Sequence, residues 1–582
     1  MKKLYQAVLF VLLCGLAPLV ANAQSFRVQC PTSTVTHPFS LHDNNSEPAY
    51  NGPTNLAVPA TPPAGTNGGF LMPTATTALT TGNVNGAIKC QQIGGGDGLS
   101  TMGDGAQIYM FSFGPLSGLA DIANGLPGTE FPNVFNTVYP GAFLPGDPAT
   151  TLSAGSGGVG TAQNTVPIGF AYNGAVGLVN DPTAQADNPS ACQPGVIAFC
   201  DTGHVDPRAI IDVGVMNGNI PAPLLAFDED DEVFFTLSNV GMIMRPDLFE
   251  QHTVHFHGYP NASSVYDGVP DASVAINIGG SFTYYYLAPD AGTYFWHCHI
   301  TPPEHLQMGM VAQLYVRPRQ DRVPTGTALY AALGQQQLDN RTKCNSTQDI
   351  LCSNPLPAVD TGATNPAAVY NAAVSGTNGP RPGYAYNDGD GSTYYDVEYP
   401  IQIHGFDPNF HFVGMTFNPE EFNDMKDKYF LLNGRSYPDT VTPGPLATQV
   451  TDGKMHFSQP LPSIINIPAG GRALLRISDL DVTEYQTLAS LGIPMTVIGF
   501  NAKLLRDQAG NNMYYNTNSI TLGGGESLDV ILETCTDAVH TAGTTCAAPL
   551  PTGTYYLYTP NLDHLSNDAE NFGGLMTEVH IN

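Results

Sequence analysis

Two histidine-rich motifs constrain the fold of this chain more than any other feature. The first runs from His252 to Gly258 with the sequence HTVHFHG, and the second is the triplet HCH at positions 297–299. Aromatic and β-branched residues surround both motifs and predict β-strands. Because side chains two residues apart in a strand share a face, the two histidines of the triplet point one way and Cys298 points the other. The last two histidines of the first motif share a face for the same reason, so the motifs predict two metal-binding clusters.

One of these clusters is suited to a single copper ion. Cys298 offers a thiolate, two histidines offer imidazoles, and a methionine offers a weak axial thioether, which together form the ligand set of a blue-copper electron-transfer centre. The four residues are His252, Cys298, His305 and Met310. Zinc is the main alternative, but structural zinc sites favour several cysteines in a closed tetrahedron. The methionine fits no zinc site, and the residues therefore predict copper.

The rest of the chain reads as short strands separated by turns. Runs such as Glu232–Leu237, Ser281–Tyr286 and Thr293–Trp296 are rich in aromatic and β-branched residues. Strands of this length and spacing predict a β-sandwich or barrel. Glycine (62) and proline (48) are abundant and only 12% of residues are charged, a composition that lacks long helical tracts. With 582 residues, the chain is too long for one core, so we expect an all-β protein with more than one domain.

Two stretches of the chain look like diverged copies of one unit. The stretch at 292–299 begins Gly-Thr-Tyr and ends in the HCH triplet, whereas the stretch at 553–560 begins Gly-Thr-Tyr and ends in Tyr-Thr-Pro. We align the strand of the first motif with Met495–Phe500, which also lacks histidine. The second copy is therefore expected to keep the strands and to lack copper ligands.

The segments HTVHFHG, YDGVPDAS, GTYFWHCH and HLQMGM resemble the copper-binding blocks of multicopper oxidases. The resemblance is strong over about 205–318, weak over about 396–582 and absent from 24–104. It implies tandem cupredoxin-like Greek-key β-sandwich domains, with type 1 copper at the four ligands above. It also implies that four further histidines hold half of a type 2/type 3 trinuclear copper cluster. These histidines are His255, His257, His297 and His299.

The resemblance further implies an oxidoreductase that takes single electrons from a small reduced substrate, a metal ion or a phenol, and passes them to dioxygen. Five residues separate His299 from His305, more than in laccases. This spacing resembles that of bacterial multicopper oxidases that oxidise metal ions, including manganese. Copper nitrite reductases carry a catalytic aspartate where this chain has His255, which argues against nitrite reduction.

The chain departs from the family in the number of its histidines. A complete trinuclear cluster takes two further HxH pairs from a second domain, and this sequence contains none. The remaining histidines near the second copy stand singly and are expected to be structural; they are His404, His411, His456 and His564. Either a homo-oligomer completes the cluster, or the protein is a type 1 copper electron-transfer or copper-binding protein without oxidase activity. The sequence leaves both alternatives open.

Composition and motifs divide the chain into five parts. Lys2 and Lys3, an apolar core and the small residues at 21–23 predict a secretory signal. The parts are a signal peptide at 1–23, an irregular N-terminal extension at 24–104, a copper-binding cupredoxin domain at 105–318 with a long insertion at about 115–205, a loop-rich linker at 319–395, and a degenerate cupredoxin domain at 396–582.

The signal predicts an exported protein, located in the periplasm, at the cell surface or outside the cell. No other apolar run is long enough to span a membrane. Ten cysteines agree with an oxidising compartment, because removal of Cys14 with the signal and assignment of Cys298 to copper leave an even set. Proximity predicts the disulfides Cys192–Cys200, Cys344–Cys352 and Cys535–Cys546, with Cys30 and Cys90 as the remainder.

Charge limits the partners. A net charge of −30 opposes binding to nucleic acids and to anionic membranes and favours cations. The acidic run Asp228–Glu232 is expected to be either a solvated turn that leads into a strand or a collector of cations. Glu304, next to His305, is either an exposed loop acid or a docking group for a metal ion.

Overall fold

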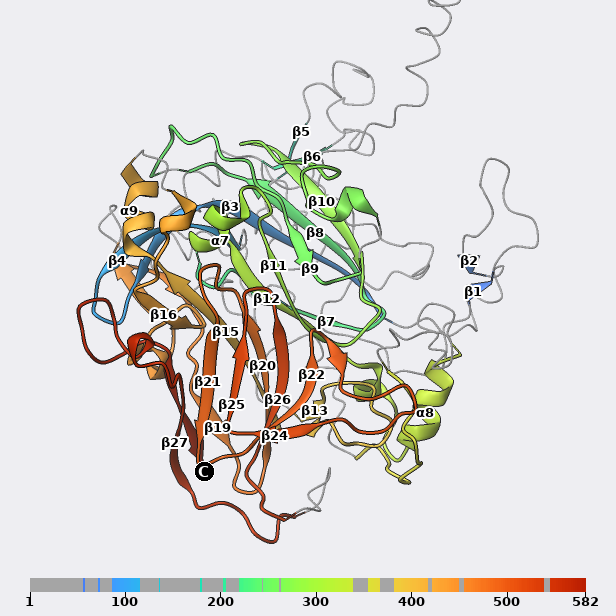
Figure 1. Cartoon of the computed structure of the whole chain (residues 1–582). Helices are drawn as coiled ribbons and strands as arrows, with labels where there is room; N and C mark the ends of the chain where they lie inside the picture. The colour runs from blue at the N-terminus through green and yellow to red at the C-terminus, as the bar shows by residue number, and fades with distance from the viewer. Residues whose placement is uncertain are drawn as a thin grey trace, which may run out of the picture.

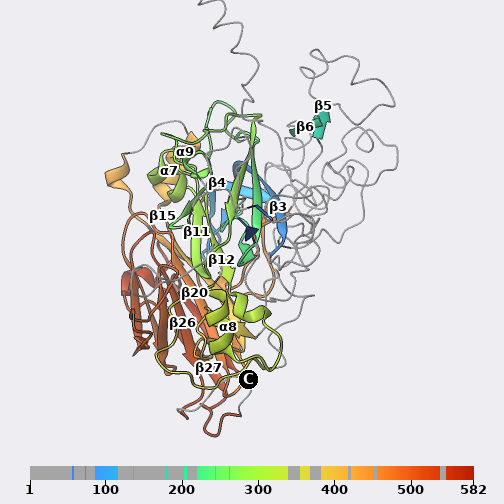
Figure 2. The same ribbon diagram turned by 90° about the vertical axis from the view of Figure 1, so that its right-hand side faces the viewer.

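The computed structural model describes residues 86–115, 136, 219–242, 244–260, 263–338, 354–366, 382–416, 421–449, 455–537 and 545–582. It also places two antiparallel pairs of short strands, β1 (Leu56–Ala57) with β2 (Met72–Pro73) and β5 (Leu178–Asn180) with β6 (Thr202–Val205). The predicted signal at 1–23 lies outside these residues, as does most of the insertion at about 115–205. The described part forms two β-sandwiches, which Figures 1 and 2 show from two sides.

The first sandwich holds both histidine motifs. One sheet has the order β10 (Ser281–Leu287), β8 (Glu232–Asn239), β3 (Ile88–Thr101) and β4 (Gln107–Pro115). The other has the order β7 (Leu225–Asp228), β12 (Val311–Arg317), β11 (Gly292–His297) and β9 (His255–His257). Apolar side chains from the two inner faces form one core that includes Phe111, Phe235 and Trp296. This core fixes the end of β11, where the HCH triplet lies.

The second sandwich contains no predicted copper ligand. One sheet has the order β16 (Tyr429–Leu432), β15 (Val397–Phe406), β20 (Arg472–Asp479), β26 (Ser527–Glu533), β22 (Met495–Phe500) and β23 (Lys503–Leu504), with β24 (Tyr515–Thr517) also paired to β22. The other has the order β19 (Ile465–Ile467), β28 (Met576–Ile581), β27 (Gly553–Tyr558), β21 (Gln486–Leu491) and β25 (Ser519–Leu522). Its separate core includes Ile401, Leu475 and Val497.

Helices are few and short in the described part of the chain. They are α7 (Pro302–Gln307), α8 (Leu329–Gln336) and α9 (Pro408–Thr416), with the 3-10 turns η2 (Ser264–Tyr266), η3 (Arg319–Arg322), η5 (Phe422–Asp424), η6 (Asp439–Val441) and η7 (Leu562–His564). Two antiparallel pairs complete the elements: β13 (Gly383–Tyr384) with β14 (Tyr394–Tyr395), and β17 (Leu446–Gln449) with β18 (Met455–Gln459). The predicted all-β fold is confirmed. Over the same residues, no helix has the length and apolar character needed to cross a membrane.

The two sandwiches share one topology, as expected for diverged copies. In the first, β11 lies between β9 and β12, and β12 runs parallel to β7. In the second, β27 lies between β21 and β28, and β28 runs parallel to β19. The strand registers align Gly292 with Gly553 and His297 with Tyr558, which agrees with the alignment made from the sequence.

One part of the sequence alignment is wrong. The strand equivalent to β9 is β21, whereas Met495–Phe500 forms β22 in the opposite sheet. The registers place Ala489 and Leu491 at the positions of His255 and His257. The error arises because β22 to β25 are additions between β21 and β26, and Met495–Phe500 resembles the histidine motif only in its β-branched pattern.

The start of the first sandwich also differs from the expectation. We expect an irregular extension as far as residue 104, but Ile88–Thr101 forms β3, which pairs in parallel with β8 and antiparallel with β4. Glycines at 94–96 and 98 hide this strand from a prediction based on propensity. The linker at 319–395 likewise contains η3, α8, β13 and β14. The remaining domain boundaries stay predictions.

The disulfide predictions are tested in part. Cys535 and Cys546 form a disulfide with a sulfur–sulfur distance of 1.97 Å, so this pair is confirmed. Cys90 is also disulfide-bonded. Cys298 is the one free cysteine among the described residues, and it is buried. The pairs Cys192–Cys200 and Cys344–Cys352 lie outside the described residues.

The acidic run Asp228–Glu232 is neither solvated nor open to cations. It forms the turn before β8, and its side chains are buried. Arg319 pairs with Asp230 at 2.6 Å, and Lys89 pairs with Asp231 at 2.9 Å. Buried charges require such partners, because desolvation is otherwise unfavourable. The run therefore anchors η3 and β3 to the first sandwich.

Buried polar contacts join the two sandwiches. Glu398 of β15 accepts from Arg317 of β12 at 2.6 Å and from Arg476 of β20 at 3.0 Å. Thr293 of β11 donates to Asp529 of β26 at 2.6 Å. Removing one partner from such a network would leave an uncompensated buried charge. The relative position of the sandwiches, and of any site between them, is thus fixed by paired charges.

A pair of equivalent glycines tests this interface. A Cβ added at Gly292 would lie 2.6 Å from the Cβ of Ala502 in the second sandwich, whereas a Cβ at Gly553 would have open space. Both residues have nearly the same backbone strain, with φ of +148° and +149°. Gly292→Ala should therefore lower the free energy of unfolding by about 1–3 kcal/mol more than Gly553→Ala, the range expected for overpacking. Thermal or urea unfolding of both variants measures the difference, and equal losses would contradict the interface described here.

Candidate metal centres

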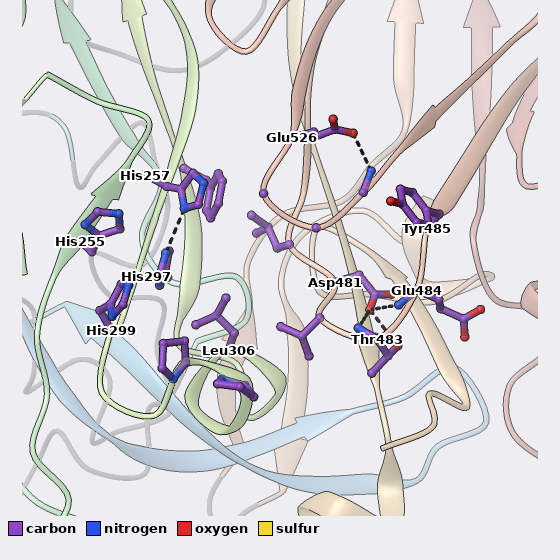
Figure 3. Close-up of a pocket in the computed structure, with 18 residues that line it drawn as sticks. His255, His257, His297, His299, Leu306, Asp481, Thr483, Glu484, Tyr485 and Glu526 are labelled. Atoms are coloured by element: carbon purple, nitrogen blue, oxygen red, sulfur yellow. Dashed lines mark hydrogen bonds between the residues drawn. The ribbon is translucent and has the colours of Figure 1, made fainter. Parts of the chain in front are cut away.

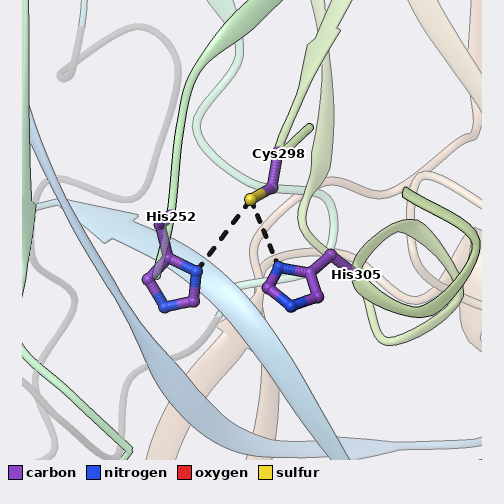
Figure 4. A group of neighbouring side chains, drawn as sticks. All are labelled: His252, Cys298 and His305. Atoms are coloured by element: carbon purple, nitrogen blue, oxygen red, sulfur yellow. Dashed lines mark hydrogen bonds between the residues drawn. The ribbon is translucent and has the colours of Figure 1, made fainter. Parts of the chain in front are cut away.

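The three predicted type 1 ligands His252, Cys298 and His305 lie together although they come from separate segments (Figure 4). His252 forms a β-bridge with Ile276, Cys298 directly follows β11, and His305 lies in α7. The Sγ of Cys298 is 3.2 Å from the Nδ1 of His305 and 4.0 Å from the Nδ1 of His252. Ligand atoms of all three residues lie within 4.8 Å of one another. One thiolate and two imidazoles at these separations fit a copper ion.

Met310, the predicted axial ligand, is buried in the same core as Cys298. The backbone ties the two residues together, because the Cys298 N–H donates to the Met310 carbonyl at 3.1 Å. The Met310 N–H in turn donates to the His305 carbonyl at 2.9 Å. The five residues after the HCH triplet allow the chain to turn into α7, which begins with Pro302 and Pro303 at positions where proline is favoured.

The surroundings of the cysteine site are apolar. The rings of Phe111 and Phe113 lie edge-on to His305 and His252, with ring centroids 5.5 Å and 6.2 Å apart. Burial lowers the pKa of His252 well below its ordinary value, so this imidazole is neutral and able to bind metal. For His305, burial also lowers the pKa, but the charge and hydrogen bond of Cys298 outweigh it and raise the pKa to about 10. Metal binding must therefore displace a proton from His305.

Gly95 of β3 makes room for one ligand. A Cβ at this position would lie 2.7 Å from the Cδ2 of His252. The glycines of β3, which concealed the strand in the sequence, thus allow the strand to pass directly behind an imidazole ring. Sequence reasoning missed this residue, and the run of glycines at 94–96 was the available signal.

The histidines on the opposite face of β11 form a second cluster. Ligand atoms of His255, His257 and His297 lie within 4.8 Å of one another. The Nδ1 of His257 is 3.3 Å from the Nε2 of His297. The fourth predicted member, His299, lies beside this set, with its ring centroid 5.1 Å from that of His255 and 5.6 Å from that of His297.

Hydrogen bonds orient two of these rings. The Nδ1 of His255 lies 2.6 Å from the Asp267 carbonyl oxygen, and the Nδ1 of His297 lies 2.8 Å from the Cys298 carbonyl oxygen. Each carbonyl accepts from the ring nitrogen and leaves the Nε2 available to a metal, an arrangement typical of histidine ligands. Asp267 belongs to the YDGVPDAS segment. That segment approaches the first motif closely, since a Cβ at Gly268 would overlap the carbonyl of Val254.

The histidine cluster opens into a cavity of about 650 Å³ between the two sandwiches (Figure 3). The first sandwich contributes the four histidines, Phe295 and residues of α7 to its lining. The second sandwich contributes two loops, residues 480–485 and 523–526. Figure 3 shows Asp481, Glu484 and Glu526 on the side opposite the histidines. The cavity therefore has an imidazole wall and an acidic, glycine-rich wall.

Among the described side chains of the second sandwich, those of His404, His411 and His564 do not join this cluster. His404 donates from Nε2 to the Leu306 carbonyl at 2.9 Å. The Nε2 of His411 is 2.9 Å from the Gln307 carbonyl oxygen, and the Nε2 of His564 is 3.2 Å from the Glu484 carboxylate. Nothing is described for the side chain of His456. Two of these histidines support the end of α7, as expected for structural residues.

A carboxylate that sequence reasoning did not single out contacts the type 1 cluster. The Oε2 of Glu250 is 3.4 Å from the Nε2 of His305, and its side chain is 27% exposed. Glu250 thus links the fully buried ring of His305, a predicted ligand, to the surface. Glu304 is half-buried rather than an exposed loop acid, and burial raises its pKa.

Substitution of Gly95 tests the cysteine site. Gly95→Ala should push the His252 ring out of position and lower copper affinity at this site at least tenfold, because one of three strong ligands is displaced. Gly96→Ala is the matched control, since its Cβ would meet Val240 rather than a ligand. Copper titration of both variants, followed by the absorption of the copper–thiolate bond, measures the effect. Equal affinities would contradict the geometry described above.

The segment that contains both clusters is similar to known proteins. Residues 202–321 match the family model described as "Multicopper oxidase". Laccase 1 of Metarhizium majus is 30% identical over 135 residues, which make up 23% of this chain and 20% of that protein. Laccase-1 of Emericella nidulans is 36% identical over 107 residues, 18% of this chain and 16% of that protein. The match therefore spans about one fifth of the length of these curated relatives.

The chain is also similar to a solved structure. The blue copper oxidase from Nitrosomonas europaea aligns with 63% of this chain and 78% of its own, at 20% identity and a TM-score of 0.38. The matched segment, residues 202–321, holds all eight predicted metal ligands, and the resemblance to the multicopper oxidase family is therefore confirmed over that segment.

Proposed function

We propose that this protein is an exported copper oxidoreductase that takes single electrons from a small reduced donor and passes them to dioxygen. The position of Cys298 carries the proposal: its sulfur belongs to one metal cluster, while its sequence neighbours His297 and His299 line the cavity. One strand end thus addresses an electron-entry site and a separate reaction cavity. The Cys535–Cys546 disulfide supports export to an oxidising compartment.

His252, Cys298, His305 and Met310 would hold the type 1 copper, which when bound supplies reversible one-electron chemistry. The chain provides the electron path on either side of it. His305 would lie on the donor side of the bound copper, and Cys298 would connect it through the backbone to His297. The contact of 2.8 Å between the Cys298 carbonyl oxygen and the Nδ1 of His297 shortens this route. Apolar burial keeps water away from the thiolate.

The donor is proposed to dock at Glu250, where the His305 ligand approaches the surface. A reduced metal ion is the favoured donor. The carboxylate would bind a cation directly, the net charge of −30 attracts cations, and the spacing before His305 resembles bacterial metal-oxidising members of the family. A phenolic donor is the alternative. The apolar rings around the site would suit it, but it would gain little from the carboxylate.

A type 1 copper protein without oxidase activity is the second candidate function. One observation favours it: within the described residues, the second sandwich places no histidine in the cavity. Such a protein would hold copper at Cys298 and exchange electrons with a partner. Four converging histidines would then have no role, and for this reason we favour the oxidase.

Cys298→Ser tests the electron-entry site. The variant should lose the visible absorption of the copper–thiolate bond and reduce oxygen consumption with any donor by about a thousandfold or more, because electrons can no longer enter. Ser is nearly isosteric with Cys, so the fold should persist, and circular dichroism provides the control. Undiminished oxygen consumption would overturn the proposed path. Absence of oxygen consumption in the unmodified copper-loaded protein, with metal and phenolic donors alike, would instead favour the electron-transfer alternative.

Glu250→Gln distinguishes the two donor classes. With a divalent metal ion as donor, the KM should rise about tenfold, equivalent to the loss of ~1.4 kcal/mol of binding. With a phenol, the KM should change less than about twofold. Asp247→Asn is the control, because it removes a charge from the same loop but pairs with Arg245 at 2.7 Å rather than with His305. Equal changes for both donors would contradict a metal-ion site at Glu250.

A further inference from the structure

The wall opposite the four histidines does not fit a three-copper cluster. Within the described residues, it offers carboxylates, a tyrosine and backbone in place of imidazoles. Those carboxylates already have partners in their own loops: Asp481 accepts from Gln486 at 2.6 Å, and Glu526 accepts from the Gly523 N–H at 2.8 Å. The carboxylate of Glu484 lies 3.2 Å from the Nε2 of His564. Among the described residues that line the cavity, the second sandwich therefore supplies no imidazole in place of the four missing histidines.

Two loops of the chain's own second sandwich already face the histidines across the cavity. A Cβ at Gly525 would lie 3.3 Å from the Nε2 of His257 and 3.8 Å from Phe295. The glycine loop at 523–525 thus lies against His257 at one edge of the cavity. Completion of the cluster by another copy would require this loop and the loop at 480–485 to move away. Both loops are held by hydrogen bonds, such as that from the Gly525 N–H to the Asp479 carbonyl at 2.9 Å.

The histidines do fit one metal ion. The three residues His255, His257 and His297 converge within 4.8 Å, and two of them have their second ring nitrogen bound to a carbonyl. Three protein ligands and an open position are the usual composition of a mononuclear catalytic metal site. The fourth histidine, His299, lies next to the set but outside the converging atoms. The cavity of about 650 Å³ leaves room for a small molecule at the open position.

We propose that the cavity holds a single copper ion bound by His255, His257 and His297 in place of a trinuclear cluster, so that dioxygen is reduced to hydrogen peroxide rather than to water. The metal site follows from the residues alone, whereas the reduction of dioxygen rests on the function proposed above. The chain then contains two copper ions, one on each face of β11, and needs no partner subunit to complete either site.

The electron balance follows from the number of metal ions. Two molecules of a one-electron donor are each oxidised by one electron at the His305 edge. The two electrons and two protons from solvent convert one dioxygen to one hydrogen peroxide, and the oxygen–oxygen bond stays intact. Water formation takes four electrons per dioxygen, whereas two copper ions that each change between the cuprous and cupric states supply two at a time.

Copper analysis of the full-length chain tests the metal site. The purified protein is reconstituted with cuprous and then cupric copper and freed of excess metal. It should then contain two copper ions per chain, and its mass in solution is measured on the same sample. His257→Ala should contain one and keep the copper–thiolate absorption. Cys298→Ser should contain one and keep only the paramagnetic resonance of a copper without thiolate. His299→Ala should retain two. Three or four copper ions in the unmodified chain, or one, would overturn the proposal, as would loss of the cavity copper in His299→Ala.

Oxygen measurements test the product separately. If peroxide is formed, catalase added after turnover should return half of the oxygen consumed. No return of oxygen would overturn the two-electron reduction. Two copper ions per chain without any oxygen consumption would support the single-ion site and overturn the oxidase function, so the two proposals fail in different measurements.

Discussion

The end of β11, which lies between β9 and β12, determines which of its predicted ligands face the cavity and which face the core. The register pairs His297 with His255 on one side and with Val311 on the other. Strand alternation then turns Cys298 away from the cavity and toward His252. A shift of one residue would exchange the two faces and separate the thiolate from its partners. Trp296, fully buried in the core, makes such a shift unfavourable, so the protein fold defines both sites before metal binds.

The second sandwich supports this arrangement although none of the predicted metal ligands lies in it. Gln307, at the end of the helix that carries His305, donates to Asp427 of the second sandwich at 3.0 Å. His404 donates to the carbonyl of Leu306 in the same helix. The shared topology of the two sandwiches depends on their apolar cores. The second sandwich keeps such a core although Ala489, Leu491 and Tyr558 stand at the positions of His255, His257 and His297. A copy can therefore lose its metal and keep a structural role as the opposite wall of the cavity.

Much of the site could be predicted from the sequence because its ligands lie close to one another along two strands. Strand alternation and the spacing of the motifs suffice to assign His255 and His257 to one cluster and Cys298 to the other. The sequence could not reveal Gly95 or Glu250, because their contacts with His252 and His305 depend on how distant segments pack. It also suggested the wrong counterpart of β9, since the additional strands β22 to β25 break the periodicity. The acidic run at Asp228–Glu232 reads as solvated because its partners, Arg319 and Lys89, lie far away in the chain.

Diffraction at the copper absorption edge from crystals of the copper-loaded protein tests the central claim most directly. The anomalous difference map should contain one peak among Cys298 Sγ and the Nδ1 atoms of His252 and His305. It should contain a second, single peak among His255, His257 and His297. Absence of the first peak would contradict the electron-entry site. Two or three peaks in the cavity would contradict the single-ion site and would indicate that further ligands come from elsewhere.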